Sequence, residues 1–304
     1  MRILFMGTPD IAAECLKALY AAGHDICAVY TRRDKPVGRK QVLTAPPVKE
    51  VALAHGTPVF QPRTLRDGSE DENIRALAPE LIVVVAYGRI LPKDILDVPP
   101  LGCVNVHASL LPKYRGSAPI NWAMLNGDAE TGVSIMYMAE ELDAGDVILT
   151  AKTPIDPEED LPALWDRLAK VGAEALAEAL PLLAAGTAPR TPQDAAQATF
   201  APMLSRELSP IDWTKPMAAI RNQVRGLIPW PCATAELAGQ RFKIYKTAVG
   251  TATDKTPGTL LSAGKKGIEV ACGDGQSLWI TELQAEGGKR MSAAAYLLGH
   301  PMNV

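Results

Sequence analysis

The chain has 304 residues, of which 47% are hydrophobic and 21% are charged. These proportions are ordinary for a soluble globular enzyme, and the length allows two domains with substantial cores. No apolar run approaches the roughly 18 residues that a membrane-spanning helix needs. The five cysteines lack the paired spacing of a zinc site, so we expect reduced thiols, no bound metal and a cytoplasmic location.

The net charge of −3 is unevenly distributed along the chain. Residues 205–304 contain 12 lysines and arginines against 8 aspartates and glutamates, whereas the rest of the chain is acidic. A basic C-terminal third on an acidic body indicates an anionic partner for that third. The excess is modest, and by itself it favours nucleic acid only slightly over a solvated surface.

The N-terminal segment predicts a βαβ unit. Ile3–Met6 has the pattern of a buried strand, a turn at Gly7 leads into an amphipathic helix that stops at Gly23, and Ile26–Tyr30 is a second strand. Such an opening is typical of a doubly wound parallel sheet. Gly7 stands alone, without the glycine series that lets a backbone approach a pyrophosphate, so no nicotinamide cofactor is predicted.

The same alternation of strands and helices continues to about residue 186. Residues 81–86 form an unbroken apolar run, which is typical of a central strand covered on both faces. Residues 147–153 are a candidate antiparallel strand, and residues 161–183 carry one apolar helical stripe. We also expect strands at 58–60, 103–107 and 131–138, and helices at 46–54, 70–77, 92–96 and 118–125.

A basic segment follows the second predicted strand at residues 32–40. Pro36 and Gly38 argue against regular helix or strand, so we interpret the segment as a mobile loop. One interpretation is a solvated surface loop, and the other is a loop that contacts nucleic-acid phosphates. Its basic residues are Arg32, Arg33, Lys35, Arg39 and Lys40.

Residues 105–116 read Asn-Val-His-Ala-Ser-Leu-Leu-Pro-Lys-Tyr-Arg-Gly. On a strand, Asn105 and His107 would point to the same face, and Val104 and Val106 to the other. A strand's carboxyl end is where open α/β sheets place their chemistry. An amide beside an imidazole could stabilise an oxyanion, or the two side chains could only cap local backbone.

The motif Asn-x-His followed by Ser-Leu-Leu-Pro-x-x-Arg-Gly resembles the signature of the folate-dependent formyltransferases, which move a formyl group from 10-formyltetrahydrofolate to an amine. These enzymes also carry a Leu-Asp-x-Gly-Asp segment, which matches residues 142–146. The resemblance implies that Asn105, His107 and Asp143 are catalytic, and that Arg115 and Gly116 shape the loop. It also implies a folate site lined by Tyr87, Gly88, Ser109, Leu110, Leu111 and Pro112.

Formyl transfer makes the formyl oxygen negative in the tetrahedral intermediate and requires a neutral attacking amine. Asn105 and His107 suit the first requirement. Asp143 suits the second, either by accepting the amine proton or by holding His107 as imidazolium, and the sequence leaves both roles open. Because the donor is an activated amide, no Ser or Cys nucleophile is needed, and the folate is a co-substrate.

The basic segment resembles an insertion, Arg-x-Asp-Lys-Pro-x-Gly-Arg, of the family members that formylate initiator methionyl-tRNA, where it reaches into the acceptor stem. Other folate formyltransferases lack or shorten it. Lys40 stands where those members often have glycine. The resemblance therefore implies that the basic residues of 32–40 bind tRNA, and it favours a monomer.

Residues 187–210 are rich in Pro, Ala, Gln and Thr and predict a linker between a catalytic domain, 1–186, and a second domain, 211–304. Short alternating segments there predict a small OB-like β-barrel, with strands at 232–237, 241–249, 258–262, 267–271 and 277–283. Asp212-Trp213 and Pro229-Trp230-Pro231 resemble the C-terminal domain of the tRNA-acting members. The basic residues of this domain either contact phosphates or are only solvated. They are Arg241, Lys243, Lys246, Lys265, Lys266, Lys289 and Arg290.

The expected fold is an open, Rossmann-like, mostly parallel α/β sheet of the formyltransferase type, followed by the OB-like domain. The resemblance implies an enzyme that formylates methionyl initiator tRNA for translation initiation, with 10-formyltetrahydrofolate as donor. The alternative function is a sugar-nucleotide N-formyltransferase with the same folate donor and a similar second domain. The basic segment 32–40 argues against it, since a small nucleotide sugar needs no such arm. A non-catalytic RNA-binding protein is a more distant alternative, and the intact Asn105, His107 and Asp143 argue against it.

Overall fold

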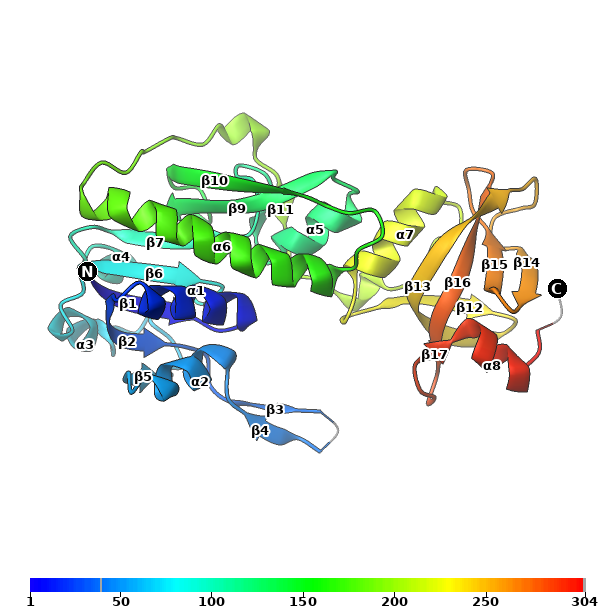
Figure 1. Ribbon diagram of the computed structural model, residues 1–304, viewed down its shortest axis with the longest axis horizontal. Coiled ribbons are helices and arrows are strands. Elements are labelled where there is room, and N and C mark those ends of the chain that lie inside the picture. The colour runs from blue at the N-terminus through cyan, green and yellow to red at the C-terminus, as the bar shows by residue number, and fades with distance from the viewer. Residues whose placement is uncertain (39, 303–304) are drawn as a thin grey trace. The chain divides into compact units, whose positions relative to one another are not determined.

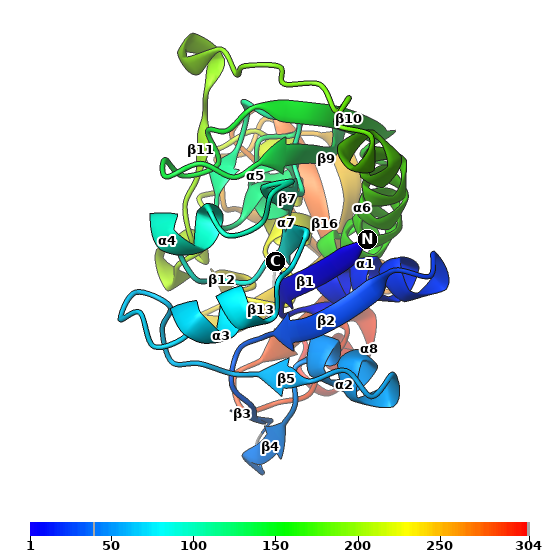
Figure 2. The ribbon, with the colours of Figure 1, turned by 90° about the vertical axis from the view of Figure 1, so that its left-hand side faces the viewer.

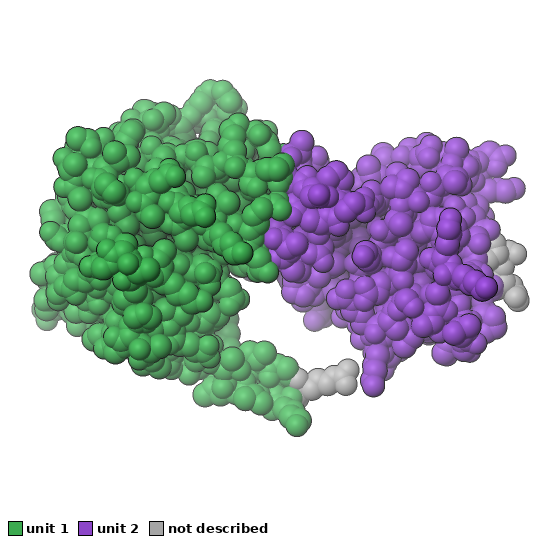
Figure 3. Space-filling model, viewed as in Figure 1, with its two compact units in different colours: residues 1–119, 130–154, 165–201 green, residues 120–129, 155–164, 202–304 purple. Residues whose placement is uncertain are grey.

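The computed structural model describes residues 1–38 and 40–302. Contacts divide the described chain into two compact units that interleave along the sequence (Figure 3). The first unit contains Met1–Pro119, Glu130–Pro154 and Trp165–Ala201, and the second contains Ile120–Ala129, Ile155–Leu164 and the chain from Pro202 onward. In the described residues, no helix combines the length and apolarity that crossing a membrane requires.

The first unit is built on a seven-stranded sheet in the order β10-β9-β7-β6-β1-β2-β5 (Figure 1). Neighbours from β5 to β7 are parallel, and β9 and β10 are antiparallel to their neighbours. This confirms the Rossmann-like, mostly parallel sheet and the antiparallel strand expected near residue 147. The strands are β1 (Arg2–Gly7), β2 (Asp25–Tyr30), β5 (Val59–Phe60), β6 (Leu81–Val85), β7 (Cys103–His107), β9 (Glu130–Tyr137) and β10 (Val147–Pro154).

Helices cover both faces of this sheet, as the fully buried β6 requires. Figure 2 shows α1 and α6 on one face and α3 and α4 on the other. The helices are α1 (Asp10–Ala21), α2 (Pro47–Ala54), α3 (Asp71–Ala76), α4 (Lys93–Leu96) and α6 (Leu161–Ala184).

The two faces of β7 meet different surroundings. Cys103 packs with Met6, Tyr87 and Ile95, which belong to the core on the α3 and α4 side. On the opposite face, a side chain at Gly172 of α6 would meet Val106. Because side chains alternate along a strand, the remaining polar residues of β7 point to the side of Cys103.

The four parallel strands at the centre of the sheet end at nearly the same level. β1, β2, β6 and β7 end at Gly7, Tyr30, Val85 and His107, so the segments that follow them start along one edge of the sheet. Those segments include the basic stretch after β2, the Tyr87-Gly88 turn after β6 and the signature loop after β7. This edge is where open α/β sheets bind ligands.

The expectation that the basic segment lacks regular structure was wrong. It forms a two-stranded hairpin, β3 (Lys35–Val37) and β4 (Val42–Thr44), that extends away from the sheet (Figure 1). A two-stranded ribbon has only edge strands, where a proline such as Pro36 can leave its missing N–H on the unpaired side. Gly38, at φ +73°, starts the turn. Arg39 lies outside the described residues.

The predicted linker also contains short elements. Phe200–Ala201 (β11) pairs in parallel with Arg115–Gly116 (β8), and two short 3-10 helices, η1 (Ala195–Gln197) and η2 (Arg206–Leu208), flank β11. A two-residue pairing has no periodicity that a sequence could reveal, so neither strand was expected.

The second unit contains the expected antiparallel strands, in the order β12-β13-β16-β15-β14, with β17 paired to β16. Apolar residues alternate inward, and Phe242, Ile268 and Ile280 lie in its core. Helix α8 was not expected, although Ser292 caps it by accepting the Ala295 N–H. The elements are β12 (Ala233–Leu237), β13 (Gln240–Ala252), β14 (Leu260–Gly264), β15 (Gly267–Ala271), β16 (Gln276–Ala285), β17 (Met291–Ser292), α5 (Pro119–Leu125), α7 (Met217–Gly226) and α8 (Ala293–Gly299).

Candidate active site

Asn105 and His107 lie at the carboxyl end of β7, and the alternating residues Val104 and Val106 are buried against the opposite face. Asn105 is partly exposed, and its side-chain amide makes no hydrogen bond within residues 1–38 and 40–302. His107 is 5% exposed. The amide is therefore available to a ligand, whereas the imidazole is held by its neighbours.

The two ring nitrogens of His107 have different partners. Nε2 lies 2.9 Å from the carbonyl oxygen of Tyr114. Because a carbonyl only accepts, Nε2 carries a proton and donates it to Tyr114. Nδ1 lies 3.7 Å from Oδ2 of Asp143, whose side chain is 13% exposed. The imidazole thus bonds local backbone and also faces a carboxylate.

Asp143 is brought to His107 by a tight loop between β9 and β10. Its Oδ2 accepts the backbone N–H of Gly116 at 2.8 Å. Asp143 adopts φ +49°, a conformation that residues other than glycine seldom adopt. Any side chain at Gly145 would collide with the carbonyl oxygen of Tyr137. The glycine of the Leu-Asp-x-Gly-Asp segment therefore lets this loop pack closely against β9.

Ser109 organises the turn that follows β7. It is fully buried, and its hydroxyl donates to the carbonyl of Lys113 at 2.7 Å. Ser134 of β9 donates to the Ser109 carbonyl at 2.7 Å and accepts the Leu111 N–H at 3.1 Å. Ser134 was missed by sequence reasoning, although it is a polar residue in an apolar strand and pairs in register with His107.

The remaining residues of this turn that were expected to bind folate are Leu110, Leu111 and Pro112. All three are partly buried, and the Leu111–Pro112 peptide bond is cis. A side chain at Gly132 of β9 would meet Leu110. The turn is therefore packed along β9 beside His107.

Tyr87 and Gly88 form the turn after β6. Tyr87 is 2% exposed, and its hydroxyl is buried without a hydrogen-bond partner among the described residues. Burial raises the pKa of this phenol to about 12, so the hydroxyl stays neutral at physiological pH. Gly88 is exposed at φ +71°. A buried, unpaired hydroxyl beside an exposed backbone turn suits a polar ligand.

Arg32 and Arg33 are tied to the body of the first unit at the base of the hairpin. Arg32 donates to the carbonyl of Gly88 at 2.6 Å, and Arg33 donates to that of Gln61 at 3.2 Å. Lys35 and Lys40 are exposed on the hairpin and have no ion pair within the described ranges. The structure thus separates two anchored arginines from two free lysines.

A polar cluster that sequence reasoning missed anchors the hairpin. Nζ of Lys49 lies 2.9 Å from both carboxylate oxygens of Asp34, and Nε2 of Gln61 donates to Oδ1 of Asp34 at 2.8 Å. These hydrogen bonds, from Gln61 first and then from Lys49, lower the pKa of the Asp34 carboxyl. The Asp in the Arg-x-Asp-Lys-Pro pattern therefore fixes the start of the hairpin.

The basic residues expected to contact phosphates in the second unit are all exposed. Two of them already have partners within that unit: Arg290 pairs with Glu282, and Nζ of Lys266 lies 5.5 Å above the Trp279 ring centroid. Arg241 and Lys243 project outward from β13, between the buried Phe242 and Ile244.

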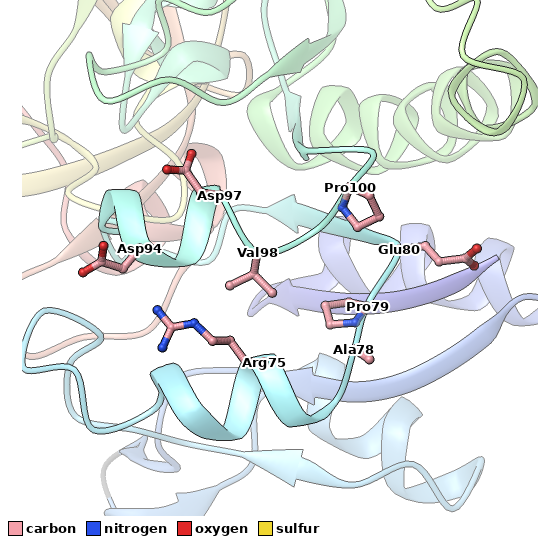
Figure 4. A pocket seen from close by; sticks show the side chains of 8 residues that line it. All are labelled: Arg75, Ala78, Pro79, Glu80, Asp94, Asp97, Val98 and Pro100. Carbon is pink, nitrogen blue, oxygen red and sulfur yellow. The ribbon is translucent and has the colours of Figure 1, made fainter.

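A hollow of about 610 Å³ lies away from this site (Figure 4). On its wall, Glu80 directly precedes β6 and Pro100 lies three residues before β7, so the hollow is toward the amino ends of these strands. Its lining residues are Arg75, Ala78, Pro79, Glu80, Asp94, Asp97, Val98 and Pro100. The candidate active site is at the opposite ends of the same strands.

Comparison with known proteins defines the class. Residues 1–180 match the family model described as formyl transferase, and residues 203–301 match the formyl transferase C-terminal domain. The chain therefore belongs to the formyl transferase family.

The relatives that match nearly the whole chain at about 50% identity include methionyl-tRNA formyltransferases. The one from Trichlorobacter lovleyi is 52% identical over 301 residues, which cover 99% of this chain and 95% of the relative. The one from Moorella thermoacetica is 52% identical over 308 residues, covering 99% of this chain and 97% of the relative.

Solved structures of more distant proteins share the fold. An N-formyltransferase from Helicobacter canadensis, in complex with folinic acid and dTDP-3-aminofucose, has a TM-score of 0.70 at 17% identity, covering 91% of this chain and 97% of that one. HypX from Aquifex aeolicus, in complex with tetrahydrofolic acid, has a TM-score of 0.67 at 19% identity, covering 98% of this chain and 47% of that one.

Proposed function

We propose that the protein transfers a formyl group from 10-formyltetrahydrofolate to the amino group of methionyl initiator tRNA, which yields N-formylmethionyl-tRNA for translation initiation. The observation that carries the proposal is the arrangement of His107 against Asp143, beside a free Asn105 amide. Two methionyl-tRNA formyltransferases that are 52% identical over nearly the whole chain also support the proposal.

The side chains of β7 suit the oxygen that becomes negative during transfer. The amide of Asn105 is free to donate, and Nδ1 of His107 is the ring nitrogen that Tyr114 leaves uncommitted. Oδ2 of the Asp143 carboxylate lies 3.7 Å from this same nitrogen, so the carboxylate borders the place where the oxyanion develops. Asn105 and His107 thus act together on the developing oxyanion.

The two carboxylate oxygens of Asp143 have different roles: Oδ2 is held in place, and Oδ1 accepts a proton. Oδ2 is held by the Gly116 N–H and faces His107. Within the described part of the chain, no hydrogen bond reaches Oδ1. Oδ1 accepts a proton from the methionyl amine as the new C–N bond forms, and that proton passes to N10 of the folate as the old C–N bond breaks. No proton is gained or lost overall.

The folate is placed against the turn at Tyr87 and Gly88 and the turn from Ser109 to Pro112. Ser109 closes its own turn with a buried hydroxyl, so its contribution is to shape the site. The unpaired Tyr87 hydroxyl and the exposed Gly88 backbone supply polar groups for the ligand.

The tRNA is bound by charge. The exposed lysines of the β3–β4 hairpin, together with Arg39, contact phosphates of the acceptor stem, and Arg32 and Arg33 hold the base of the hairpin. The OB-like domain, residues 211–304, adds its exposed basic side chains along the same nucleic acid. The catalytic domain is residues 1–186, and the enzyme acts as a monomer in the cytoplasm.

The test is formylation by the purified protein with 10-formyltetrahydrofolate and two acceptors in parallel, charged initiator tRNA and a nucleotide-linked amino sugar. We expect formyl-methionine on the tRNA and no product on the sugar. Transfer to the sugar alone would keep the chemistry and overturn the proposed acceptor. An absence of transfer to either acceptor would overturn the proposal itself.

A further inference from the structure

The segment 191–201, which we call the strap, is bonded to two loops of the active site. At one end, Thr191 and Val147 exchange backbone hydrogen bonds of 2.8 and 3.0 Å, beside the loop that carries Asp143. At the other end, Thr199 accepts the Arg115 N–H at 2.8 Å, and Ala201 accepts the Ser117 N–H at 2.9 Å. The strap therefore joins the Asp143 loop to the signature loop.

Gln193 is the strap residue that reaches both loops with its side chain. Its Nε2 donates to the carbonyl oxygens of Asp143 and Gly145, at 2.8 Å each. Its Oε1 accepts from Nε of Arg115 at 3.0 Å. Arg115 is 4% exposed and belongs to the signature. One partly buried amide thus uses both donors and its acceptor on groups that flank the catalytic carboxylate.

The geometry of the Asp143 loop explains why such a tie matters. Asp143 holds φ +49°, which persists only where surrounding contacts over-determine the backbone. The backbone carbonyls of Asp143 and Gly145 both accept hydrogen bonds from Gln193, which brackets the strained residue. The same loop sets Oδ2 at 3.7 Å from His107 and at 2.8 Å from the Gly116 N–H. A small shift of the loop would alter both distances.

We propose that Gln193 is a positioning residue for formyl transfer, which fixes the Asp143 carboxylate relative to His107 without itself touching the substrates. The inference rests on the proposed catalytic role of Asp143. It assigns a function in the reaction to a segment whose composition is that of a linker. Neither a motif nor a charge pattern marks this glutamine, because its partners lie 50 and 78 residues away in sequence.

The first test compares Gln193→Met with Gln197→Met. Methionine keeps the length of the side chain and removes all three hydrogen bonds. Gln197 lies on the same strap, but among the described residues its amide bonds only Asp194, at 2.8 Å. We expect Gln193→Met to lower kcat by about 10- to 100-fold, the scale of a misplaced catalytic group, with both KM values within about threefold. Gln197→Met should match the wild type in kcat, KM and Tm.

A double-mutant cycle separates positioning from a merely structural role. If Gln193 acts through Asp143, then Gln193→Met should cause no further loss in single-turnover rate when Asp143 is already alanine. The Gln193→Met protein should stay fully folded at the assay temperature, with a wild-type circular dichroism spectrum, although the lost hydrogen bonds will lower its Tm. Independent, additive losses in the cycle, or a fall in kcat that follows the fraction unfolded, would overturn the inference.

The outcomes also distinguish this inference from the function on which it depends. Wild-type turnover by Asp143→Ala would overturn the catalytic assignment and the inference with it. An inactive Asp143→Ala protein beside a fully active Gln193→Met protein would overturn only the positioning role of Gln193.

Discussion

His107 has one ring nitrogen committed to the Tyr114 carbonyl and the other turned toward Asp143. This arrangement makes the imidazole a fixed group, whereas Asn105 beside it has no partner within the residues that the structure describes. Substitution of Asn105 therefore removes a catalytic donor and leaves the packing of β7 largely intact, because Val104 and Val106 bury the opposite face.

Asn105→Ala should lower kcat by about 10²- to 10³-fold, because it removes one donor to the developing oxyanion. The Tm should stay close to that of the wild type, since the amide bonds nothing in the described protein. Steady-state kinetics with methionyl-tRNA would show the loss. Near-normal turnover would contradict the assignment of Asn105.

Tyr87→Phe should leave the Tm unchanged or raise it, because the lost hydroxyl is buried and unpaired. If that hydroxyl bonds the folate, the KM for 10-formyltetrahydrofolate should rise about 3- to 10-fold, the scale of one neutral hydrogen bond. Tyr245→Phe is the matched control, since its hydroxyl bonds Gln284 at 2.9 Å, and it should leave the folate KM unchanged. A lower Tm with an unchanged folate KM for Tyr87→Phe would contradict this account.

The hairpin β3–β4 combines an anchored base with exposed positive charge. Its base is fixed by the Asp34, Lys49 and Gln61 cluster, and its tip presents Lys35 and Lys40 to solvent. Arg32 also links the base of the hairpin to the Gly88 turn after β6. The charge at the tip is therefore carried on an anchored ribbon.

A Lys35→Ala, Lys40→Ala double variant should raise the KM for tRNA and leave the folate KM unchanged. The slope of log affinity against log salt should also become shallower, by about 0.9 for each phosphate that the variant no longer neutralises. Lys170→Ala, an exposed lysine of α6, is the control for net charge. An unchanged KM and salt slope in the double variant would show that the hairpin lysines are only solvated.

The sequence predicted the elements that depend on local pattern and missed those that depend on distant partners. Alternation along 103–107 placed Asn105 and His107 on one face, and spacing placed the strands of both units close to where they lie. The prediction of an irregular loop at residues 32–40 was wrong because proline is excluded from central strands but tolerated in the edge strands of a two-stranded ribbon such as that of Pro36. Gln193, Ser134 and Gln61 act across long sequence separations that no local pattern records.

At the scale of the whole molecule, all five cysteines are free and buried. Burial raises the pKa of Cys15 and Cys103 to about 12 and that of Cys272 to about 11. Thiol reagents attack the thiolate, so such groups should react slowly in the folded protein.

A thiol-labelling assay at pH 8 should therefore find little reaction in the native protein and five thiols after denaturation. The full count on unfolding is the internal control. Fast labelling of the native protein would show that its packed units open readily, and would contradict the burial described above.

The most direct test of the central claim is the single-turnover rate of formyl transfer to methionyl-tRNA by the wild type and by Asp143→Asn. Asparagine keeps the size of the side chain but removes the charge that faces His107 and the oxygen that accepts the amine proton. We predict rapid transfer by the wild type and a loss of at least about 10²-fold in the variant, with both proteins folded. Comparable rates would show that the site at the end of β7 does not carry the reaction.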